Sequence, residues 1–512
     1  MPTPDDSVLN PNENRLIMDE KNYKPHEQKT EYNRLFSMLT EEQRRVYQDI
    51  IYSVNQNKGG MFFVHGFGGT GKIFLWSILG ADIRSKSNIV LNVASSGIAA
   101  LLLEGGRTAH SRFCMPININ EYSMCSIDAE SDLAELIREA KLIIWDEAPM
   151  MNKHCFETLD RTLQDIMKCN RIFGGKVVVL GGNFRQILPV IPEGGRVATV
   201  LASIKSSLLW PSCKVLKLTE NMRLRKGVNN VQSDALAEFS KWLLDIGDGK
   251  INEPNDGEVE IEIPEDLLTA SEDPIHAIVH EIYGKSFAKE NDPKFVKRRA
   301  ILSPRNEDVD KINQYMLSQL PGEERRYLSL DSIETSDTSV FDDMVYSQEF
   351  LNSINVSGLP KHELTLKKGA PIMLLRNIDP KGGLCNGTRL IVTQMANHVI
   401  EARIVTGNGI NEKVLIPRMF VSPPDAKFSF RMRRRKFPVA LAYAITINKS
   451  QGQTLEYVGL FLPKLVFTHG QLYVALSRVT TRKGLKILIT NEDGTCQNKT
   501  LNVFFKEVFD NI

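Results

Sequence analysis

Short apolar runs alternate with amphipathic stretches along most of this chain. Between residues 39 and 220, stretches of helical periodicity such as Ser131–Ala140 and Cys155–Met167 separate runs that have the length of a strand. These strand-like runs are Met61–His65, Ile89–Ala94, Leu142–Trp145 and Lys176–Leu180. Apolar strands that alternate with helices in this way predict a parallel sheet with helices on both faces.

The second half of the chain resumes this alternation after an interruption. Asp248–Asp292 is polar and weakly patterned, and residues 388–437 show the shorter alternation that is typical of hairpins. The further strand-like runs are Arg299–Ser303, Leu390–Gln394, Ile400–Val405, Lys413–Ile416, Ala440–Ile447 and Leu485–Thr490. The pattern therefore indicates a second α/β domain that carries a β insertion.

We predict an α/β fold with two tandem domains. The first covers residues 39–220, and the second covers 221–387 and 438–512, with the β insertion at 388–437. Residues 1–38 are polar and rich in Pro, Asn and Glu, so we expect them to form an N-terminal extension or linker.

Composition narrows the class of protein only slightly. The 512 residues are 42% hydrophobic and 24% charged, and 63 basic against 62 acidic residues give a net charge of +1. Any surface that binds nucleic acid must therefore be local. Seven cysteines are scattered without a Cys-x-x-Cys pair, which is typical of reduced thiols in an intracellular protein. No apolar run approaches the ~20 residues of a membrane span, so we expect a soluble protein without membrane contacts.

A glycine-rich loop follows the first strand. The strand Met61–His65 leads into Gly66-Phe67-Gly68-Gly69-Thr70-Gly71-Lys72, and the apolar helix Ile73–Leu79 comes next. In such a loop, backbone N–H groups surround a phosphate chain at the start of a helix, and the lysine reaches the outer phosphates. We therefore predict that these glycines, Thr70 and Lys72 bind a nucleotide.

The same residues also satisfy the Gly-x-Gly-x-x-Gly pattern of dinucleotide sites. That alternative needs an acidic residue ~20 positions later, at the end of the second strand. Here the second strand ends in Ser95-Ser96-Gly97, so a triphosphate is favoured over a nicotinamide cofactor. One position departs from the triphosphate pattern: Ile73 stands where a Ser or Thr hydroxyl normally ligates Mg²⁺.

Two later strand ends carry chemistry that suits hydrolysis of a triphosphate. Asp146 and Glu147 follow a buried strand, where one carboxylate can hold Mg²⁺ and the next can polarise the attacking water. Gln186 follows the next strand and can sense the γ-phosphate, although its segment taken alone could equally be a polar loop. Two arginines, Arg223 and Arg478, are candidates for cations that act from another domain, although an arginine is by default a surface charge.

Several short segments suit contacts with the backbone of a nucleic acid. Hydroxyl, amide and basic groups of this kind recognise phosphate and sugar rather than base edges. The candidates are Ser95, Ser96, Gly97, His110, Ser111, Thr446, Asn448, Lys449 and Ser450. In addition, Phe428–Phe437 contains five cations interleaved with aromatic residues; it could hold a single strand by charge and stacking, or equally be a solvated strand of the insertion.

Together these segments resemble the Pif-type (petite integration frequency) DNA helicases of superfamily one, and within them the helicase half of plant Helitron transposon proteins. The resemblance covers Leu35–Phe509. The matching motifs, in order, are Leu39–Gln43, Gly66–Lys72, Asp146–Glu147, Gly181–Gln186, Glu220–Arg223, Thr446–Thr454 and His469–Arg478.

The resemblance implies two RecA-like domains, with ATP and Mg²⁺ in the cleft between them and single-stranded DNA across their tops. It implies 5′ to 3′ movement, DNA forks as substrates, and a nuclear role in repair, recombination, telomere maintenance or transposon replication. It also implies a small wedge at Arg112–Asp132 that meets the duplex, and an SH3-like form for the β insertion. Protein partners are not implied.

The resemblance also assigns roles to single residues. It implies that Gln43 reads the adenine, that Gly452 contacts the nucleotide, and that Arg223 and Arg478 are arginine fingers. Two residues depart from the family's pattern, Ile73 in place of Thr and Asn183 in place of Asp. Two hypotheses therefore remain: an active ATP-dependent helicase, or a related protein that binds ATP and DNA with little turnover.

Overall fold

The computed structural model describes residues 14–222, 230–252, 257–284, 293–333, 346–356, 358–380, 382–407, 409–423 and 430–510. These residues form two units. Unit 1 comprises Met1–Phe184, Leu188–Gly227 and Glu507–Ile512, and unit 2 comprises Arg185–Ile187 and Val228–Lys506.

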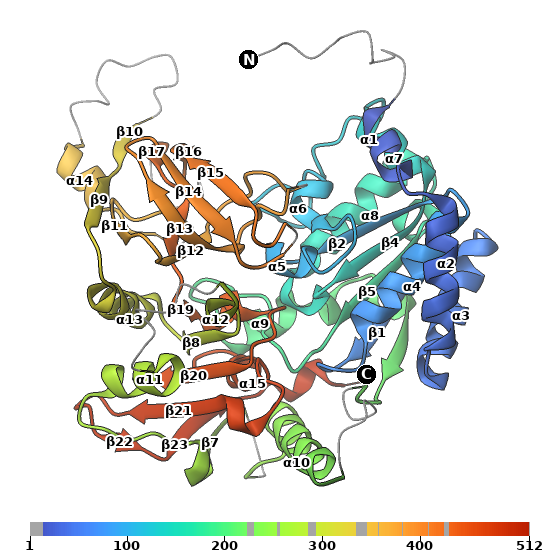
Figure 1. Ribbon diagram of the computed structural model, residues 1–512. Coiled ribbons are helices and arrows are strands. Elements are labelled where there is room, and N and C mark those ends of the chain that lie inside the picture. The colour runs from blue at the N-terminus through green and yellow to red at the C-terminus, as the bar shows by residue number, and fades with distance from the viewer. Residues whose placement is uncertain are drawn as a thin grey trace. The chain divides into compact units, whose positions relative to one another are not determined.

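Unit 1 is built on a parallel sheet. Among the described residues the sheet has six strands in the order β3-β2-β4-β5-β1-β6, and every neighbouring pair is parallel (Figure 1). The strands are β1 (Gly60–Gly66), β2 (Ile89–Ala94), β3 (Arg107–Thr108), β4 (Ala140–Asp146), β5 (Val177–Gly182) and β6 (Cys213–Leu218). The four strands that we predicted for this half are therefore present, and their pairing is parallel.

The helices of unit 1 cover this sheet because consecutive side chains of each central strand are buried on opposite faces. They are α1 (Arg15–Lys21), α2 (Pro25–Ser37), α3 (Glu41–Asn55), α4 (Lys72–Ser85), α5 (Gly97–Ala100), α6 (Ala109–Arg112), α7 (Asp132–Glu139), α8 (Lys153–Met167) and α9 (Arg196–Ala202). On one face, Phe62, Val64 and Ile144 form a core with apolar residues of α2, α3 and α4.

The N-terminal segment differs from our expectation of a linker. Residues 15–37 form α1 and α2, and Leu35 and Ile17 are buried. Glu20 of α1 pairs with the buried Arg112, which stands at the start of the predicted wedge. A polar composition predicts a linker. The structure differs because a few apolar residues of the segment pack it onto unit 1. The segment predicted to form the wedge, from Arg112 to Asp132, runs mostly through turns and bends between α6 and α7.

Unit 2 contains a second α/β sheet, in the order β19-β8-β20-β21-β22, with only β22 antiparallel. Its strands are β8 (Arg299–Ser303), β19 (Ala444–Thr446), β20 (Tyr457–Leu462), β21 (Leu485–Thr490) and β22 (Cys496–Gln497). A separate pair joins β7 (Glu258–Glu262) to β23 (Lys499–Val503). The helices of unit 2 are α10 (Asn230–Gly247), α11 (Pro274–Tyr283), α12 (Pro293–Lys297), α13 (Asn306–Gln319), α14 (Gln348–Ser353) and α15 (Gln471–Leu476).

In the second half of the chain, the structure differs in two places from the elements that the hydrophobic pattern predicts. The weakly patterned zone Asp248–Asp292 contains β7 and α11, whose Ile278 and Ile282 join the core of the second sheet. The predicted strand Ala440–Ile447 is instead two strands, β18 (Val439–Leu441) and β19, which belong to different sheets. The side chain of Asn313 causes this break, because it accepts from the backbone N–H groups of residues 443 and 444 and donates to the carbonyls of residues 441 and 444.

The β region of unit 2 is larger than the insertion that we expected at residues 388–437. Its main sheet has the order β15-β14-β13-β12-β18, and two smaller sheets have the orders β10-β17-β16 and β11-β9. The strands are β9 (Glu324–Leu328), β10 (Leu330–Ile333), β11 (Glu363–Lys367), β12 (Pro371–Leu374), β13 (Arg389–Met395), β14 (Val399–Ile404), β15 (Lys413–Pro417), β16 (Met419–Val421) and β17 (Met432–Lys436).

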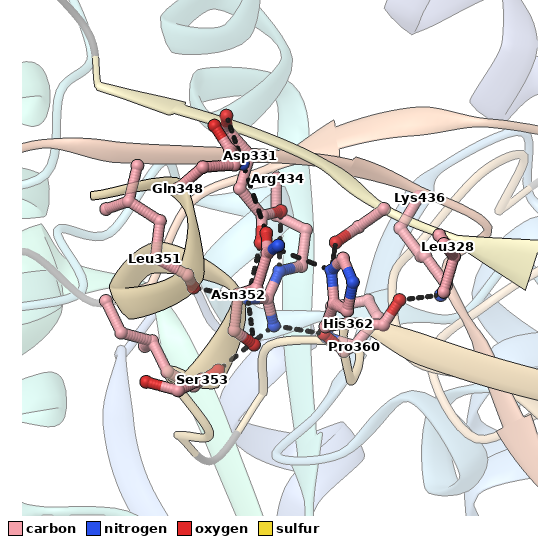
Figure 2. A network of polar contacts seen from close by, with 12 residues as sticks. Leu328, Asp331, Gln348, Leu351, Asn352, Ser353, Pro360, His362, Arg434 and Lys436 are labelled. Atoms are coloured by element: carbon pink, nitrogen blue, oxygen red, sulfur yellow. Dashed lines mark hydrogen bonds and ion pairs between the residues drawn. The ribbon is translucent and has the colours of Figure 1, made fainter.

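The basic strand β17 is half buried, so only part of this run can contact solvent or DNA. Arg434 and Lys436 are fully buried, whereas Arg435 between them is exposed. Arg434 forms a bidentate pair with Asp331 of β10, in which both N–O distances are 2.8 Å. Figure 2 shows these two residues within their network of polar contacts. Arg434 also donates to the carbonyls of Leu351, Ile354 and Pro360, and Lys436 donates to those of Tyr327 and His362. These two cations are therefore structural and are not available to DNA.

We predict that Arg434→Ala lowers the free energy of unfolding of the chain by about 3–5 kcal/mol, because it leaves the buried carboxylate of Asp331 without its bidentate arginine partner. Urea denaturation followed by circular dichroism would measure the loss. Arg435→Ala is the matched control on the same strand, and we expect it to change stability by less than about 1 kcal/mol. Equal losses for the two variants would contradict this account of β17.

Candidate nucleotide and DNA site

The glycine-rich loop connects β1 to α4 and is shaped by positive backbone angles. Gly69 and Gly71 have φ of 103° and 82°, conformations that side chains rarely adopt. The Thr70 hydroxyl donates to the carbonyl of Phe67 at 2.9 Å, and Lys72 Nζ donates to that of Gly66. Lys72 is the first residue of α4, so the loop ends at a helix N-terminus as the sequence predicted.

Gln43 lies directly against this loop. Its carboxamide closes the capping box of α3 with Thr40, and its Nε2 donates to the carbonyl of Thr70 at 3.0 Å. A Cβ on Gly71 would lie 2.5 Å from that nitrogen, so the glycine makes the contact possible. The structure thus assigns Gln43 a contact with the loop, while its predicted contact with adenine stays a prediction.

Asp146 ends β4 and is 3% exposed. Burial raises the pKa of its carboxyl group, and the nearby Lys72 ammonium is the strongest influence in the opposite direction. Within the described residues Asp146 Oδ1 is buried without a hydrogen-bond partner of good geometry, and such an incompletely satisfied carboxylate is typical of a functional site. The carboxylate of Asp146 therefore fits the predicted Mg²⁺, whereas Ile73, half buried against the core of unit 1, offers no ligand atom.

Glu147 has a strained backbone. Its φ of 53° and ψ of 38° lie in the left-handed region, between the end of β4 and the 3₁₀ turn Ala148–Met150. Such a conformation costs on the order of 1–3 kcal/mol in a non-glycine residue and is found most often at functional sites. This left-handed residue turns the chain just after Asp146, between the strand and the 3₁₀ turn.

Gly181 of β5 provides the room around Asp146. An added Cβ would lie 2.4 Å from Cζ2 of Trp76 and 2.8 Å from Oδ1 of Asp146. Trp76 was not a predicted site residue, and Gly181 was predicted only as the first residue of the motif Gly181–Gln186, without a role of its own. Two sequence features could have indicated these residues. They are the large side chain four positions after the loop lysine and the glycine at the end of the next strand. Beyond Gly181, Asn183 is fully buried, and the ring of Phe184 packs on Phe63 with centroids 4.9 Å apart.

The remaining candidates in unit 1 are predicted DNA contacts, and they differ in their burial and hydrogen bonding. Ser95 and Ser96 are engaged within the protein: Ser95 Oγ accepts from Trp145 Nε1 at 3.0 Å, and Ser96 Oγ caps α5 at Ala99. Gly97 is buried within α5, whereas Ser111 is exposed. Burial lowers the pKa of His110, which disfavours its charged form as a phosphate contact near neutral pH. The DNA contacts of this group stay predictions.

In unit 2, the segment after β19 brings several candidates together. Thr446 and Lys449 line a cavity of about 910 Å³ that also borders α13, residues 352–356 and residues 358–365. Asn448 accepts from Gln471 Nε2 at 3.1 Å, and Ser450 is fully buried. Gly452 follows with a φ of 77°. The segment therefore places Thr446 and Lys449, two of the predicted DNA contacts, beside a cavity of their own unit.

Arg478 is 7% exposed and is held by this same loop. It donates to the carbonyls of Val474 and Gln453 at 2.8 and 3.1 Å, and to the hydroxyl of Ser477 at 2.9 Å. Gln186 is also buried, and its backbone lies against Gly470, where a Cβ would come within 2.7 Å of it. Arg223 lies outside the described residues.

The described part of the chain adds two negative findings. It contains no group of three or more His, Cys, Asp or Glu side chains placed to hold a metal ion. None of its helices is long and apolar enough to cross a membrane. A metal ion at Asp146 would therefore need further ligands from a bound molecule and water.

Comparisons with known proteins bear on the whole chain. The family model described as PIF1-like helicase matches residues 38–257, and that of the DNA helicase Pif1 2B domain matches residues 349–395. The chain is 28% identical over 473 residues to ATP-dependent DNA helicase PIF1 of Danio rerio, covering 92% of this chain and 64% of that protein. It is 28% identical over 453 residues to ATP-dependent DNA helicase Pif1 of Bdellovibrio bacteriovorus, covering 88% and 89%. The chain thus spans about three fifths of the length of the vertebrate relatives.

Solved structures agree on the fold. A structure of two coordinating Pif1 helicases that unwind forked double-stranded DNA superposes with a TM-score of 0.61 at 25% identity, covering 88% of this chain and 91% of that one. Pif1 helicase from Candida albicans superposes with a TM-score of 0.58 at 23% identity, covering 92% and 98%. The α/β fold prediction and the resemblance to Pif-type helicases are confirmed. The narrower likeness to Helitron proteins stays a prediction.

We predict that Gly181→Ala destabilises unit 1 by about 1–3 kcal/mol, because the added methyl group overlaps Trp76 and Asp146. Gly195→Ala is the control, since a Cβ there meets nothing within 4 Å. Thermal unfolding of both variants would measure the difference. A Gly181→Ala protein as stable as the control would show that the strand end has more room than the structure gives it.

Proposed function

This chain belongs to the PIF1-like helicase family, and from that premise we propose that it is an ATP-dependent DNA helicase. It binds single-stranded DNA, moves along it from 5′ to 3′ with ATP hydrolysis, and opens DNA forks. The observation that carries this proposal is the glycine-rich loop that ends at Lys72, the first residue of α4, together with the buried carboxylate of Asp146 at the end of a strand of the same parallel sheet. A cation from the loop and a carboxylate from the sheet are the pair that phosphoryl transfer requires.

The site residues of unit 1 have separate roles in ATP hydrolysis. The backbone of Gly66, Gly68, Gly69, Thr70 and Gly71 holds the phosphates, and Lys72 neutralises charge that develops on the outer ones. Asp146 would hold Mg²⁺, which supplies further positive charge at the phosphates when it is bound. Glu147, the next residue, accepts a proton from the attacking water.

Other residues act on the same phosphates or on the base. Gln186 senses the γ-phosphate, Gly452 contacts the nucleotide, and Arg223 and Arg478 supply cations to the transition state. Gln43 reads the adenine. Its contact with the carbonyl of Thr70 supports this role only in part, since it shows that the carboxamide lies next to the phosphate loop.

The DNA candidates bind the sugar-phosphate backbone rather than the bases. They are Ser95, Ser96, Gly97, His110, Ser111, Thr446, Asn448, Lys449 and Ser450. The cavity beside Thr446 and Lys449 supports the contacts of unit 2, because it offers amide and basic groups in a recess. We infer from the family a nuclear place of action in repair, recombination, telomere maintenance or transposon replication.

Strand displacement tests the proposal. A labelled duplex with a 5′ single-stranded tail should be opened in the presence of ATP and Mg²⁺, and the same duplex with a 3′ tail should not. Lys72→Ala is the control for nucleotide dependence. Displacement of neither substrate, in a protein that is folded, would contradict the helicase proposal.

A second function is favoured by Ile73: a protein that binds ATP and single strands with little turnover. Ile73 offers no hydroxyl to the metal ion, and correct placement of the metal is part of the electrostatic stabilisation of the transition state. Asn183, which stands where the family usually has Asp, is buried at the end of β5 and adds a second departure.

We predict that Ile73→Thr raises the single-turnover rate of ATP hydrolysis by one or more orders of magnitude, with ~1.4 kcal/mol of barrier for each tenfold. Nucleotide affinity should strengthen only moderately, because the phosphates still contact the loop. Rapid-quench measurement of phosphate formation in both proteins would decide this, with Ile73→Val as a control for volume. Equal rates in the native protein and the Thr variant would contradict the hypothesis that Ile73 limits turnover.

A further inference from the structure

Two buried polar atoms lie close to each other at the end of the first sheet. Within the described residues, Trp76 Nε1 and Asp146 Oδ1 are both buried without a partner in good hydrogen-bonding geometry. Trp76 is 1% exposed and Asp146 is 3% exposed, so water does not satisfy either atom. A buried donor or acceptor left alone is unfavourable, and such groups are rare in native proteins.

The backbone explains how these atoms meet. Trp76 lies on α4, four residues after Lys72 and three after Ile73, so all three project from one side of the helix. Asp146 comes from the end of β4, and Gly181 of β5 stands beside both. The missing Cβ of Gly181 is the space into which the indole edge and the carboxylate oxygen project, 2.4 and 2.8 Å from its ideal position.

The electrostatics agree with a donor–acceptor relation. The indole N–H of Trp76 is one of the groups that lower the pKa of Asp146 against the effect of burial, together with Lys72 and the backbone of Glu147. An indole nitrogen is a donor only. It can therefore hold an ionised carboxylate without competing for the metal ion.

We propose that Trp76 is a positioning residue for Asp146, which its indole N–H holds through Oδ1 so that the second carboxylate oxygen is presented to the metal ion of a bound nucleotide. The inference rests on the proposed function. Ile73 gives the indole its importance, because an apolar side chain at position 73 offers Asp146 no hydrogen from that face of the loop. Trp76 supplies a hydrogen from the next turn of the same helix.

A purely structural role for Trp76 predicts a different result. If the indole only filled the core, Phe would serve almost as well, and any loss would appear as lower stability. A positioning role instead predicts that metal dependence changes while the fold and the nucleotide pocket are retained. The two roles are therefore separated by a measurement of binding rather than of stability.

The test is an equilibrium titration with Mg²⁺ of the full chain and a fluorescent ADP derivative. In Trp76→Phe we expect the half-saturating Mg²⁺ concentration to rise about tenfold, equivalent to ~1.4 kcal/mol. Trp210→Phe is the matched control, since Trp210 is an indole of the same unit that packs on Phe63 and Phe184. A shift no larger than that of the control would overturn the proposal.

A double-mutant cycle with Ile73→Thr tests the link between the two positions. When Thr supplies a hydroxyl at position 73, Trp76→Phe should change the half-saturating Mg²⁺ concentration by less than twofold. The same tenfold change in both backgrounds would show that the two positions act independently and would overturn the link. If Trp76→Phe does not fold, β-(3-benzothienyl)alanine at position 76 keeps the shape of the indole and lacks only the N–H.

Measurements on the native chain distinguish a failure of the proposed function from a failure of the positioning role of Trp76. If it binds the ADP derivative without any dependence on Mg²⁺, the proposed metal-dependent function itself fails. If its binding depends on Mg²⁺ and the Trp76 variants match the Trp210 control, only the positioning role of Trp76 fails.

Discussion

The parallel register of β1, β5 and β4 is the constraint on which the first unit depends. Val64 pairs with Gly181 and His65 with Gly182, while Trp145 pairs with Leu180, so these three strands reach one edge of the sheet together. Helices cover both faces, and the edge is where polar loops can leave the core. The glycine-rich loop, the two carboxylates and the segment after β5 all start from this edge, although more than 110 residues separate the first from the last.

Buried charges in this protein follow two different rules. Arg434 and Asp331 are both fully buried, form a bidentate pair, and Arg434 fills its remaining hydrogen bonds with backbone carbonyls (Figure 2). Asp146 is almost as deeply buried but keeps one oxygen without a partner. A satisfied pair contributes to structure, whereas an incompletely satisfied carboxylate at a strand end is typical of a functional site. The contrast explains why the charge-rich run of β17 is structural and the isolated Asp146 is the better candidate for chemistry.

Much of the fold was accessible from the sequence because the central strands are buried on both faces. β2 and β21 have the predicted bounds, and β1, β4 and β5 differ from them by at most two residues at either end. Local patterns were insufficient where a distant residue decides the conformation. Asn313 splits the predicted strand Ala440–Ile447 by hydrogen bonds that span about 130 positions, and Asp331 draws Arg434 into the core from 103 positions away.

The candidate site shows the same division. The glycine-rich loop and Asp146 were recognisable because phosphate chemistry constrains residue type and spacing locally. The contact of Gln43 with Thr70, the space that Gly181 provides and the approach of Trp76 to Asp146 could not be read from spacing, because they depend on how three strands and two helices pack. The contacts of the serine side chains were the least predictable, since the hydroxyl groups of Ser95 and Ser96 form hydrogen bonds within the protein.

The central claim is that this sheet edge hydrolyses ATP in response to DNA. The most direct measurement is the steady-state rate of phosphate release by the native chain with and without a single-stranded oligonucleotide. The account predicts a Mg²⁺-dependent rate that rises at least tenfold with the oligonucleotide and is abolished by Lys72→Ala. A rate that the oligonucleotide leaves unchanged, or that survives the loss of Lys72, would contradict it.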